Sequence, residues 1–136
     1  MDSIGKNLGI LCRQLHIYLK HALRETDVTP TELMFLGFLR NGDGRSQEEI
    51  ARDFCIDKAA VARTLQSLES KKLVVRGSDA ADKRNKLVYT TSRASQYNGQ
   101  LSKIQTKWIT TAFNGVDDSD IAVFAKVLET VVNNIR

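Results

Sequence analysis

The sequence predicts one mainly helical domain with a single small β-hairpin. Apolar residues recur at the three- and four-residue spacing of helices along most of the 136 residues. One short segment, residues 86–90, instead alternates apolar and polar side chains as a strand does. No linker divides the chain, and its length suits one domain, so we expect residues 1–136 to fold together.

The N-terminal part predicts two helices. Residues 3–24 carry a narrow apolar stripe, typical of a helix that packs along another helix. The stripe consists of Ile4, Leu8, Leu11, Leu15, Tyr18, Leu19 and Ala22. A second helix is expected to begin with Thr29 as its cap, Pro30 in its first position and Glu32 completing a capping box. The segment NGDG, residues 41–44, ends it.

Two short capped helices follow in close succession. Ser46 with Glu49 has the spacing of a capping box before a helix that reaches Phe54. Asp57 is a suitable N-cap for a helix over about 58–71. Two short helices with such a tight connection predict a helix-turn-helix.

The rest of the chain predicts a hairpin and two further helices. A strand over 73–75, a turn over 77–82 and a return strand over 86–90 form the hairpin. A long helix is expected from about Ser92 to a break at Asn114 and Gly115, and Asp117 is expected to cap the last helix. The inner face of that helix carries Ile121, Phe124, Leu128, Val131, Val132 and Ile135.

Composition argues against several classes of protein. No apolar stretch approaches the ~20 residues of a membrane span, and MDSIGKNLGI does not have the pattern of a signal peptide. We therefore expect a cytoplasmic protein. The two cysteines and two histidines lack the spacing of a zinc site, so we expect no metal and no cofactor. The absence of a phosphate-binding glycine loop and of a nucleophile motif argues against an enzyme.

The net charge of +4 is concentrated in one region. Residues 71–93 hold seven basic residues against two acidic ones, whereas basic and acidic residues balance before residue 45 and after residue 93. A local basic zone on a neutral body is typical of a protein that binds a polyanion.

The predicted helix over 58–71 has a face suited to reading DNA. Because Val61, Leu65 and Leu68 must face the core, the opposite face is expected to meet solvent. Arg63 suits a bidentate contact to guanine and Gln66 one to adenine. The other candidate DNA contacts on this helix are Lys58, for a phosphate, and Ala59, Ala60 and Ser67.

The tip of the predicted hairpin is basic. Arg84 can enter a minor groove, where the negative potential favours a guanidinium. Asp82 is expected to pair with a neighbouring arginine, such as Arg84, and to fix its direction. Lys83 and Lys86 suit the flanking phosphates. The hairpin is therefore interpreted as a wing that contacts DNA.

Residues 29–94 resemble the winged helix-turn-helix of the MarR (multiple antibiotic resistance regulator) family. The resemblance rests on SQEEIARDF, AVARTLQSLESKKLVVR and DKRNKLVYTT in this order, with long helices at both ends. The chain departs from the family at Lys72, where glycine is usual, and over residues 90–94, where Leu-Thr-x-Lys-Gly is common. The resemblance implies a homodimer held by residues 1–28 and 95–136, which binds a palindromic operator on double-stranded DNA.

The resemblance also implies control, usually the release of a repressor by a small aromatic effector. Candidate effector contacts are Tyr18, His21, Phe35, Phe38 and Trp108. The alternative for each of these side chains is a place in the hydrophobic core.

The sequence is also compatible with two alternative functions. Family members that sense peroxide place a cysteine in the first helix, which makes Cys12 a redox candidate, against the alternative of an inert buried thiol. Cys55 is expected to fill a tight turn. A winged helix can also contact a protein partner in place of DNA, and the salt dependence of binding would separate the two.

Overall fold

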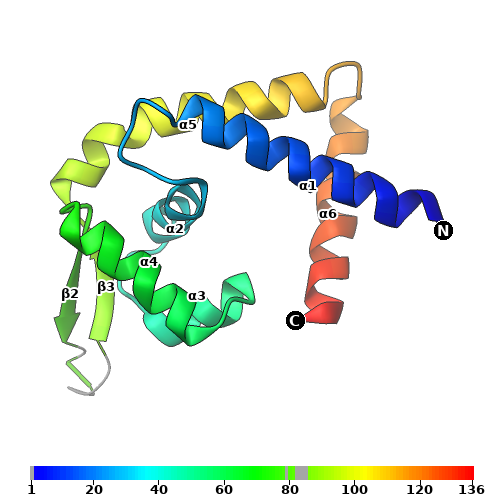
Figure 1. Ribbon diagram of the computed structural model, residues 1–136. Coiled ribbons are helices and arrows are strands. Elements are labelled where there is room, and N and C mark those ends of the chain that lie inside the picture. The colour runs from blue at the N-terminus through cyan, green and yellow to red at the C-terminus, as the bar shows by residue number, and fades with distance from the viewer. Residues whose placement is uncertain (1, 79, 82–85) are drawn as a thin grey trace.

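The computed structural model describes residues 2–78, 80–81 and 86–136. In this part of the chain it contains six helices and three strands (Figure 1). In chain order they are α1 (Asp2–Ala22), α2 (Pro30–Arg40), β1 (Arg45–Ser46), α3 (Gln47–Phe54), α4 (Lys58–Ser70), β2 (Val74–Ser78), β3 (Lys86–Thr90), α5 (Ser92–Ala112) and α6 (Asp118–Ile135). The predicted class, mainly helical with a small wing, is confirmed.

Side-chain caps define where most of the helices begin. The side chains of Thr29, Ser46 and Asp57 each accept a hydrogen bond from the backbone N–H three residues later, at 3.2, 3.1 and 2.8 Å. Thr91 caps α5 in the same way, at 3.3 Å. Asp117 occupies the N-cap of α6, but its side chain makes no cap hydrogen bond, so the prediction of a side-chain cap there was wrong.

The sheet is antiparallel, with the strand order β1-β3-β2. The predicted return strand is confirmed, but the two-residue β1 is too short to show any alternation in the sequence, and it was missed. The strand β2 runs to Ser78, so Gly77 pairs with Leu87 and does not begin the turn. A side chain could not replace Gly77 freely, because a Cβ there would lie 3.1 Å from the ring of Tyr89.

The hydrophobic core lies between α2, α3, α4 and the sheet, and it is completed by Leu19, Leu23, Val28 and Leu101 from α1, the loop after it and α5. The largest side chains that are less than 2% exposed are Phe35, Leu33, Leu39, Ile50, Leu65, Leu68, Leu73, Val61, Val74 and Val88. The predicted inward positions of α4, namely Val61, Leu65 and Leu68, are confirmed as fully buried. We call residues 29–94 the head, and residues 1–28 and 95–136 the arms.

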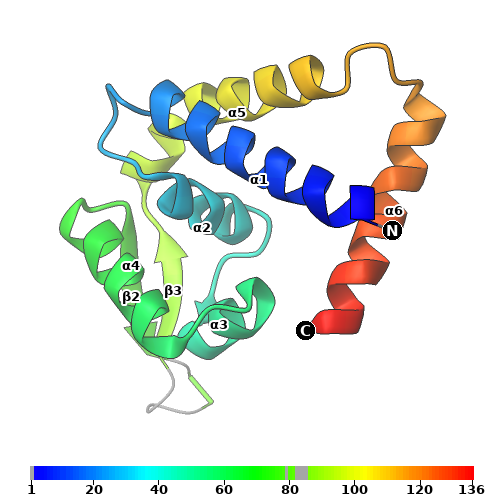
Figure 2. The same cartoon turned by 45° about the vertical axis from the view of Figure 1, so that its right-hand side comes forward.

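The arms are built differently from the head. Helices α1 and α5 lie side by side above α2, and α6 extends down from the far end of α5 (Figures 1 and 2). The hydroxyl of Tyr18 joins α1 to α5 by donating to the carbonyl of Ile104 at 2.8 Å. Helix α6 contains no buried residue, although its sequence is largely apolar. None of the helices within the described residues is long and apolar enough to cross a membrane.

Candidate nucleic-acid interface

Helices α3 and α4 form the predicted helix-turn-helix through the short turn that begins at Cys55. Cys55 has a φ of 52°, in the left-handed region. Its N–H donates to the carbonyl of Arg52 at 3.3 Å, and the N–H of Ile56 donates to that of Ala51 at 3.0 Å. This is the Schellman end of a helix, which usually uses glycine. The prediction that Cys55 lies in a tight turn is confirmed, and its thiol is exposed.

Helix α4 ends in the same way. Lys72 has a φ of 61°, and its N–H donates to the carbonyl of Glu69 at 3.0 Å. The N–H of Leu73 reaches back to the carbonyl of Leu68 at 2.9 Å. Lys72 therefore takes the conformation that glycine supplies more easily, and the departure from the family pattern at this residue leaves the Schellman geometry in place.

One long side of α4 is free of the core. Lys58, Ala59, Arg63 and Gln66 are exposed, and Ala60 is half-buried. Lys58 lies 3.7 Å from the carboxylate of Glu48, and both side chains are so exposed that the pair adds little stability. Helix α4 thus offers a surface of two alanines, an arginine and a glutamine on which no other described element packs.

Ser67 differs from the other candidates on α4. It is half-buried, and its hydroxyl donates to Oε1 of Glu32 at 3.3 Å. The carboxylate of Glu32 also accepts hydrogen bonds from Nζ of Lys71 at 2.8 and 2.9 Å. The prediction that Glu32 completes a capping box was therefore wrong, because its side chain turns to α4 and not to the start of its own helix.

The wing is formed by β2 and β3. Lys86 begins β3 and is exposed, whereas the candidates Asp82, Lys83 and Arg84 lie outside the described residues. Arg76 of β2 donates to Glu69 of α4 at 2.9 Å and to Gln47 of α3 at 3.0 Å. This bridge between both helices and the wing was not predicted, because nothing in the sequence around Arg76 indicates which side chains it contacts.

Two of the candidate effector contacts line a groove between α1 and α5. Tyr18 and His21 meet Arg24, Lys103 and Lys107 there, and the groove has a volume of about 380 Å³. Such a volume falls within the ordinary range of small-molecule sites. The groove combines an apolar floor with three cationic side chains, those of Arg24, Lys103 and Lys107, and the imidazole of His21.

The other three candidates lie elsewhere. The ring of Trp108 lies beside that of Tyr18, with their centroids 5.3 Å apart, so Trp108 supports the floor of the groove. Phe35 is fully buried in the head. Phe38 is half-buried and packs edge-on against Phe54, with centroids 5.4 Å apart. Phe35 and Phe38 thus belong to the hydrophobic core, which was the alternative to an effector contact.

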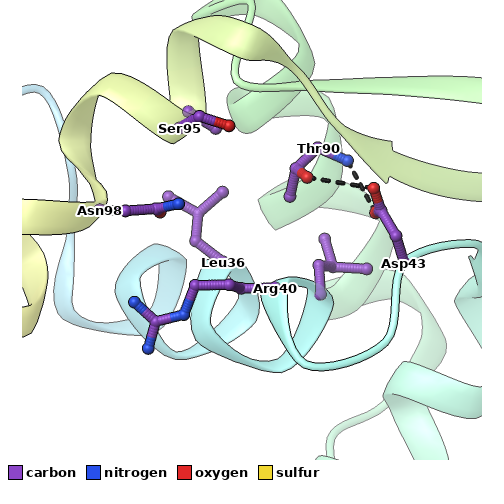
Figure 3. A pocket seen from close by; sticks show the side chains of 8 residues that line it. Leu36, Arg40, Asp43, Thr90, Ser95 and Asn98 are labelled. Carbon is purple, nitrogen blue, oxygen red and sulfur yellow. Dashed lines mark hydrogen bonds between the residues drawn. The ribbon is translucent and has the colours of Figure 1, made fainter.

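A second, smaller pocket lies between α2 and α5 and has a volume of about 210 Å³ (Figure 3). Arg40 of α2 and Asn98 of α5 line it, and Figure 3 shows Asp43 turned to Thr90 at the opposite end from Asn98. The carboxylate of Asp43 accepts hydrogen bonds from the N–H and the hydroxyl of Thr90, at 2.9 and 3.1 Å. This pocket could not be predicted from the sequence, because its polar side chains come from separate helices and a loop.

The thiol of Cys12 is exposed on α1, so the expectation that it is buried was wrong for the single chain. Helix α1 has only one buried residue, Leu19, because little of the helix is covered by the rest of the chain. Within the described residues, no three His, Cys, Asp or Glu side chains come together as a metal site would need.

Comparison with known proteins identifies the class of this fold. A family model for the MarR family matches residues 26–85. The chain is similar in structure to a MarR transcriptional regulator from Methanosarcina mazei Go1, with a TM-score of 0.88 and 28% identity, over 98% of this chain and 96% of that one.

Two further solved structures share the fold. One, from Listeria monocytogenes and assigned to the MarR family, is complexed with a 26mer DNA; it has a TM-score of 0.88 and 21% identity, over 96% of this chain and 87% of that one. The other is BpsR of Bordetella bronchiseptica, whose DNA binding is regulated by 6-hydroxynicotinic acid; it has a TM-score of 0.83 and 19% identity, over 95% and 92%.

The molecule is a winged helix-turn-helix protein of the DNA-binding class. Its residues 26–85 match the MarR family, and the chain is similar over 98% of its length to a MarR transcriptional regulator, in agreement with the resemblance seen in the sequence.

Proposed function

We propose that this protein is a homodimeric repressor that binds a palindromic operator and releases it when a small effector binds. The proposal of a dimer rests on the observation that α6 has no buried residue. Its exposed apolar side chains are Val123, Phe124, Val127, Leu128, Val131 and Ile135. An apolar face of this length is typical of an interface, and a second copy of the same helix is complementary to it.

The reading surface follows from the exposed side of α4. In this proposal Arg63 and Gln66 contact base edges, Lys58 contacts a phosphate, and Ala59 and Ala60 allow close approach. We also propose that the wing contacts DNA, with Arg84 entering the minor groove, Lys83 and Lys86 meeting phosphates, and Asp82 holding an arginine in place. The complex of the Listeria monocytogenes protein with a 26mer DNA supports the assignment of DNA as the partner.

Selection from a random duplex library with purified protein tests this function. Two α4 helices related by a two-fold axis should enrich a palindrome whose half-sites lie about one DNA turn, or ~34 Å, apart. The affinity should fall steeply as salt rises, because bound cations are released from the phosphates. A folded dimer that enriches no sequence would contradict the proposal and favour a protein partner.

Two substitutions assign roles within the surface. Arg63→Ala should weaken operator binding by about 1–3 kcal/mol and relax preference at one base position. Arg84→Ala should weaken binding by a similar ~1–3 kcal/mol if this side chain enters the minor groove. Arg13→Ala, which removes an exposed arginine from α1, is the control and should leave the affinity unchanged. A uniform loss across all sequences for Arg63→Ala would assign Arg63 to phosphate.

The groove between α1 and α5 is the proposed effector site. Its lining combines the ring of Tyr18 with Arg24, Lys103 and Lys107, and the described residues provide no ion-pair partner for these three cations. An aromatic acid would fill the floor and neutralise the rim. BpsR, which shares the fold, responds to 6-hydroxynicotinic acid, which supports this class of ligand.

The fluorescence of Trp108 reports on this groove, since the chain has one tryptophan. Titration with 6-hydroxynicotinic acid should quench it, and the pair Lys103→Ala and Lys107→Ala should abolish the quenching. Arg40→Ala, which removes a cation from the pocket between α2 and α5, should leave it intact. The reverse pattern would move the effector site to that pocket.

A further inference from the structure

The C-terminal end of α4 is held by an ion pair whose carboxylate is buried and whose lysine is partly exposed. Within the part of the chain that the structure describes, Glu32 is the one charged residue in the buried core, with a side chain 4% exposed. Nζ of Lys71 lies 2.8 Å from Oε1 and 2.9 Å from Oε2 of Glu32. The hydroxyl of Ser67 donates to the same carboxylate at 3.3 Å. A buried carboxylate is costly unless it is paired and hydrogen-bonded, so Glu32 requires this placement of α4.

Lys71 has no donor left for DNA. Its ammonium group can donate three hydrogen bonds, and it uses two on Glu32 and one on the backbone carbonyl of Asp27. Lys72, the next residue, has an exposed side chain, and its hydrogen bonds to other described residues involve its backbone alone. The two neighbouring lysines therefore have different surroundings, although both lie at the end of the same helix.

The same end of α4 is joined to α5. The hydroxyl of Thr91, which caps α5, donates to the carbonyl of Lys72 at 2.7 Å, and its N–H donates to the carbonyl of Leu73 at 3.1 Å. Asp27 also places its carboxylate 3.9 Å from the guanidinium of Arg93 in the first turn of α5. Helix α2, the loop after α1 and the start of α5 therefore all meet the last turn of α4 (Figures 1 and 2).

We infer that Glu32 and Lys71 are positioning residues that set the angle at which α4 meets DNA. The inference rests on the proposed DNA-reading function. Lys58 lies one helix length from Lys71, about 20 Å away, so a tilt of about 10° at Lys71 would displace the first turn of α4 by about 3 Å. Hydrogen bonds tolerate a variation of only about 0.5 Å in length, so such a tilt would break contacts to base edges.

The test compares Lys71→Met with Lys72→Met. Both variants remove one positive charge from the same end of α4 and keep an unbranched side chain, but only the first removes the partner of Glu32. The ratio of affinities for the selected operator and for a scrambled duplex is measured by fluorescence anisotropy, at a temperature where circular dichroism shows each variant folded. Lys71→Met should lower this ratio by about tenfold or more, and Lys72→Met should leave it within about twofold.

The double variant Glu32→Gln with Lys71→Met separates positioning from stability. Lys71→Met alone leaves a buried carboxylate without its counter-ion and should lower the melting temperature. Removing the charge of Glu32 as well should restore the melting temperature, whereas the operator-to-scrambled ratio should stay low because α4 is still not held.

Each outcome has one meaning. If the ratio recovers together with the melting temperature, or if Lys71→Met and Lys72→Met lower it equally, the inference is wrong and the proposed function stands. If the wild-type protein binds the selected operator no more tightly than other duplexes, the proposed function and the inference are both wrong.

Discussion

The head and the arms of this protein differ in where their apolar residues go. The head places ten large apolar side chains at less than 2% exposure. In α6, by contrast, Val123 is 59% and Ile135 is 78% exposed. Both parts have the apolar spacing of amphipathic helices, so the difference arises from what each face meets.

This contrast shows that the core around the head is complete within one chain, whereas the apolar face of α6 stays uncovered. Helices α2, α3 and α4 and the sheet enclose a common interior, whereas α6 packs on little of its own chain. Arg136, the residue that follows α6, donates hydrogen bonds to the carbonyl and the carboxylate of Asp53 in the head, at 2.8 and 3.2 Å.

The largest effect is expected in the core of the head. Leu65→Ala should lower the free energy of unfolding by about 2–5 kcal/mol, because it removes a fully buried side chain and leaves a cavity. Gln66→Ala, on the exposed side of the same helix, should change it by less than about 0.5 kcal/mol. Urea unfolding at a fixed protein concentration measures both. Equal losses would mean that the head has no core of its own.

Substitutions on the apolar face of α6 should weaken the association of the two subunits and leave the fold of the head unchanged. Leu128→Glu should weaken the proposed dimer by about 3 kcal/mol or more, because a carboxylate would be buried without a partner. Sedimentation equilibrium measures the association. Lys126→Glu places the same carboxylate on the opposite side of α6 and should leave the dimer intact. A dimer that survives Leu128→Glu would show that another surface covers the arms.

The N-caps offer a smaller comparison between the two parts. Asp57 accepts a hydrogen bond from the N–H of Ala60 at 2.8 Å, so Asp57→Ala should cost about 1 kcal/mol of unfolding free energy. Asp117 holds the equivalent position before α6 but makes no such hydrogen bond. Asp117→Ala should therefore lower the free energy of unfolding by only a few tenths of that amount. Thermal unfolding of the two variants measures the difference. A larger loss at Asp117 would contradict the observed geometry.

The smallest effect has the opposite sign. Lys72 has a φ of 61°, a conformation that is strained for any residue with a Cβ, so Lys72→Gly should stabilise the protein by about 0.5–1 kcal/mol. Cys55→Gly should act in the same direction at the end of α3. In the arm, Gly115 already has a φ of 82°, and Gly115→Ala should destabilise by about 1 kcal/mol. Thermal unfolding measures all three changes. A loss of stability in Lys72→Gly would show that the side chain of Lys72 makes a stabilising contact.

Most of the helices could be predicted because their signals are local. Thr29, Ser46 and Asp57 each satisfy a backbone N–H three residues away, and this geometry depends on nothing else in the fold. The exposed face of α4 could be predicted too, because Val61, Leu65 and Leu68 fix which side meets the core.

The sequence alone thus determined the class of fold, the order of its helices, the return strand and the side of α4 that is open to a partner. The tertiary structure decided that Glu32 pairs with Lys71, 39 positions away, and that Arg76 bridges two helices. It also decided that Tyr18 lies over α5 and that β1 joins the sheet. Periodicity and caps act within one or two helical turns, whereas an ion pair, a groove or a strand pairing exists only once distant segments have been packed together.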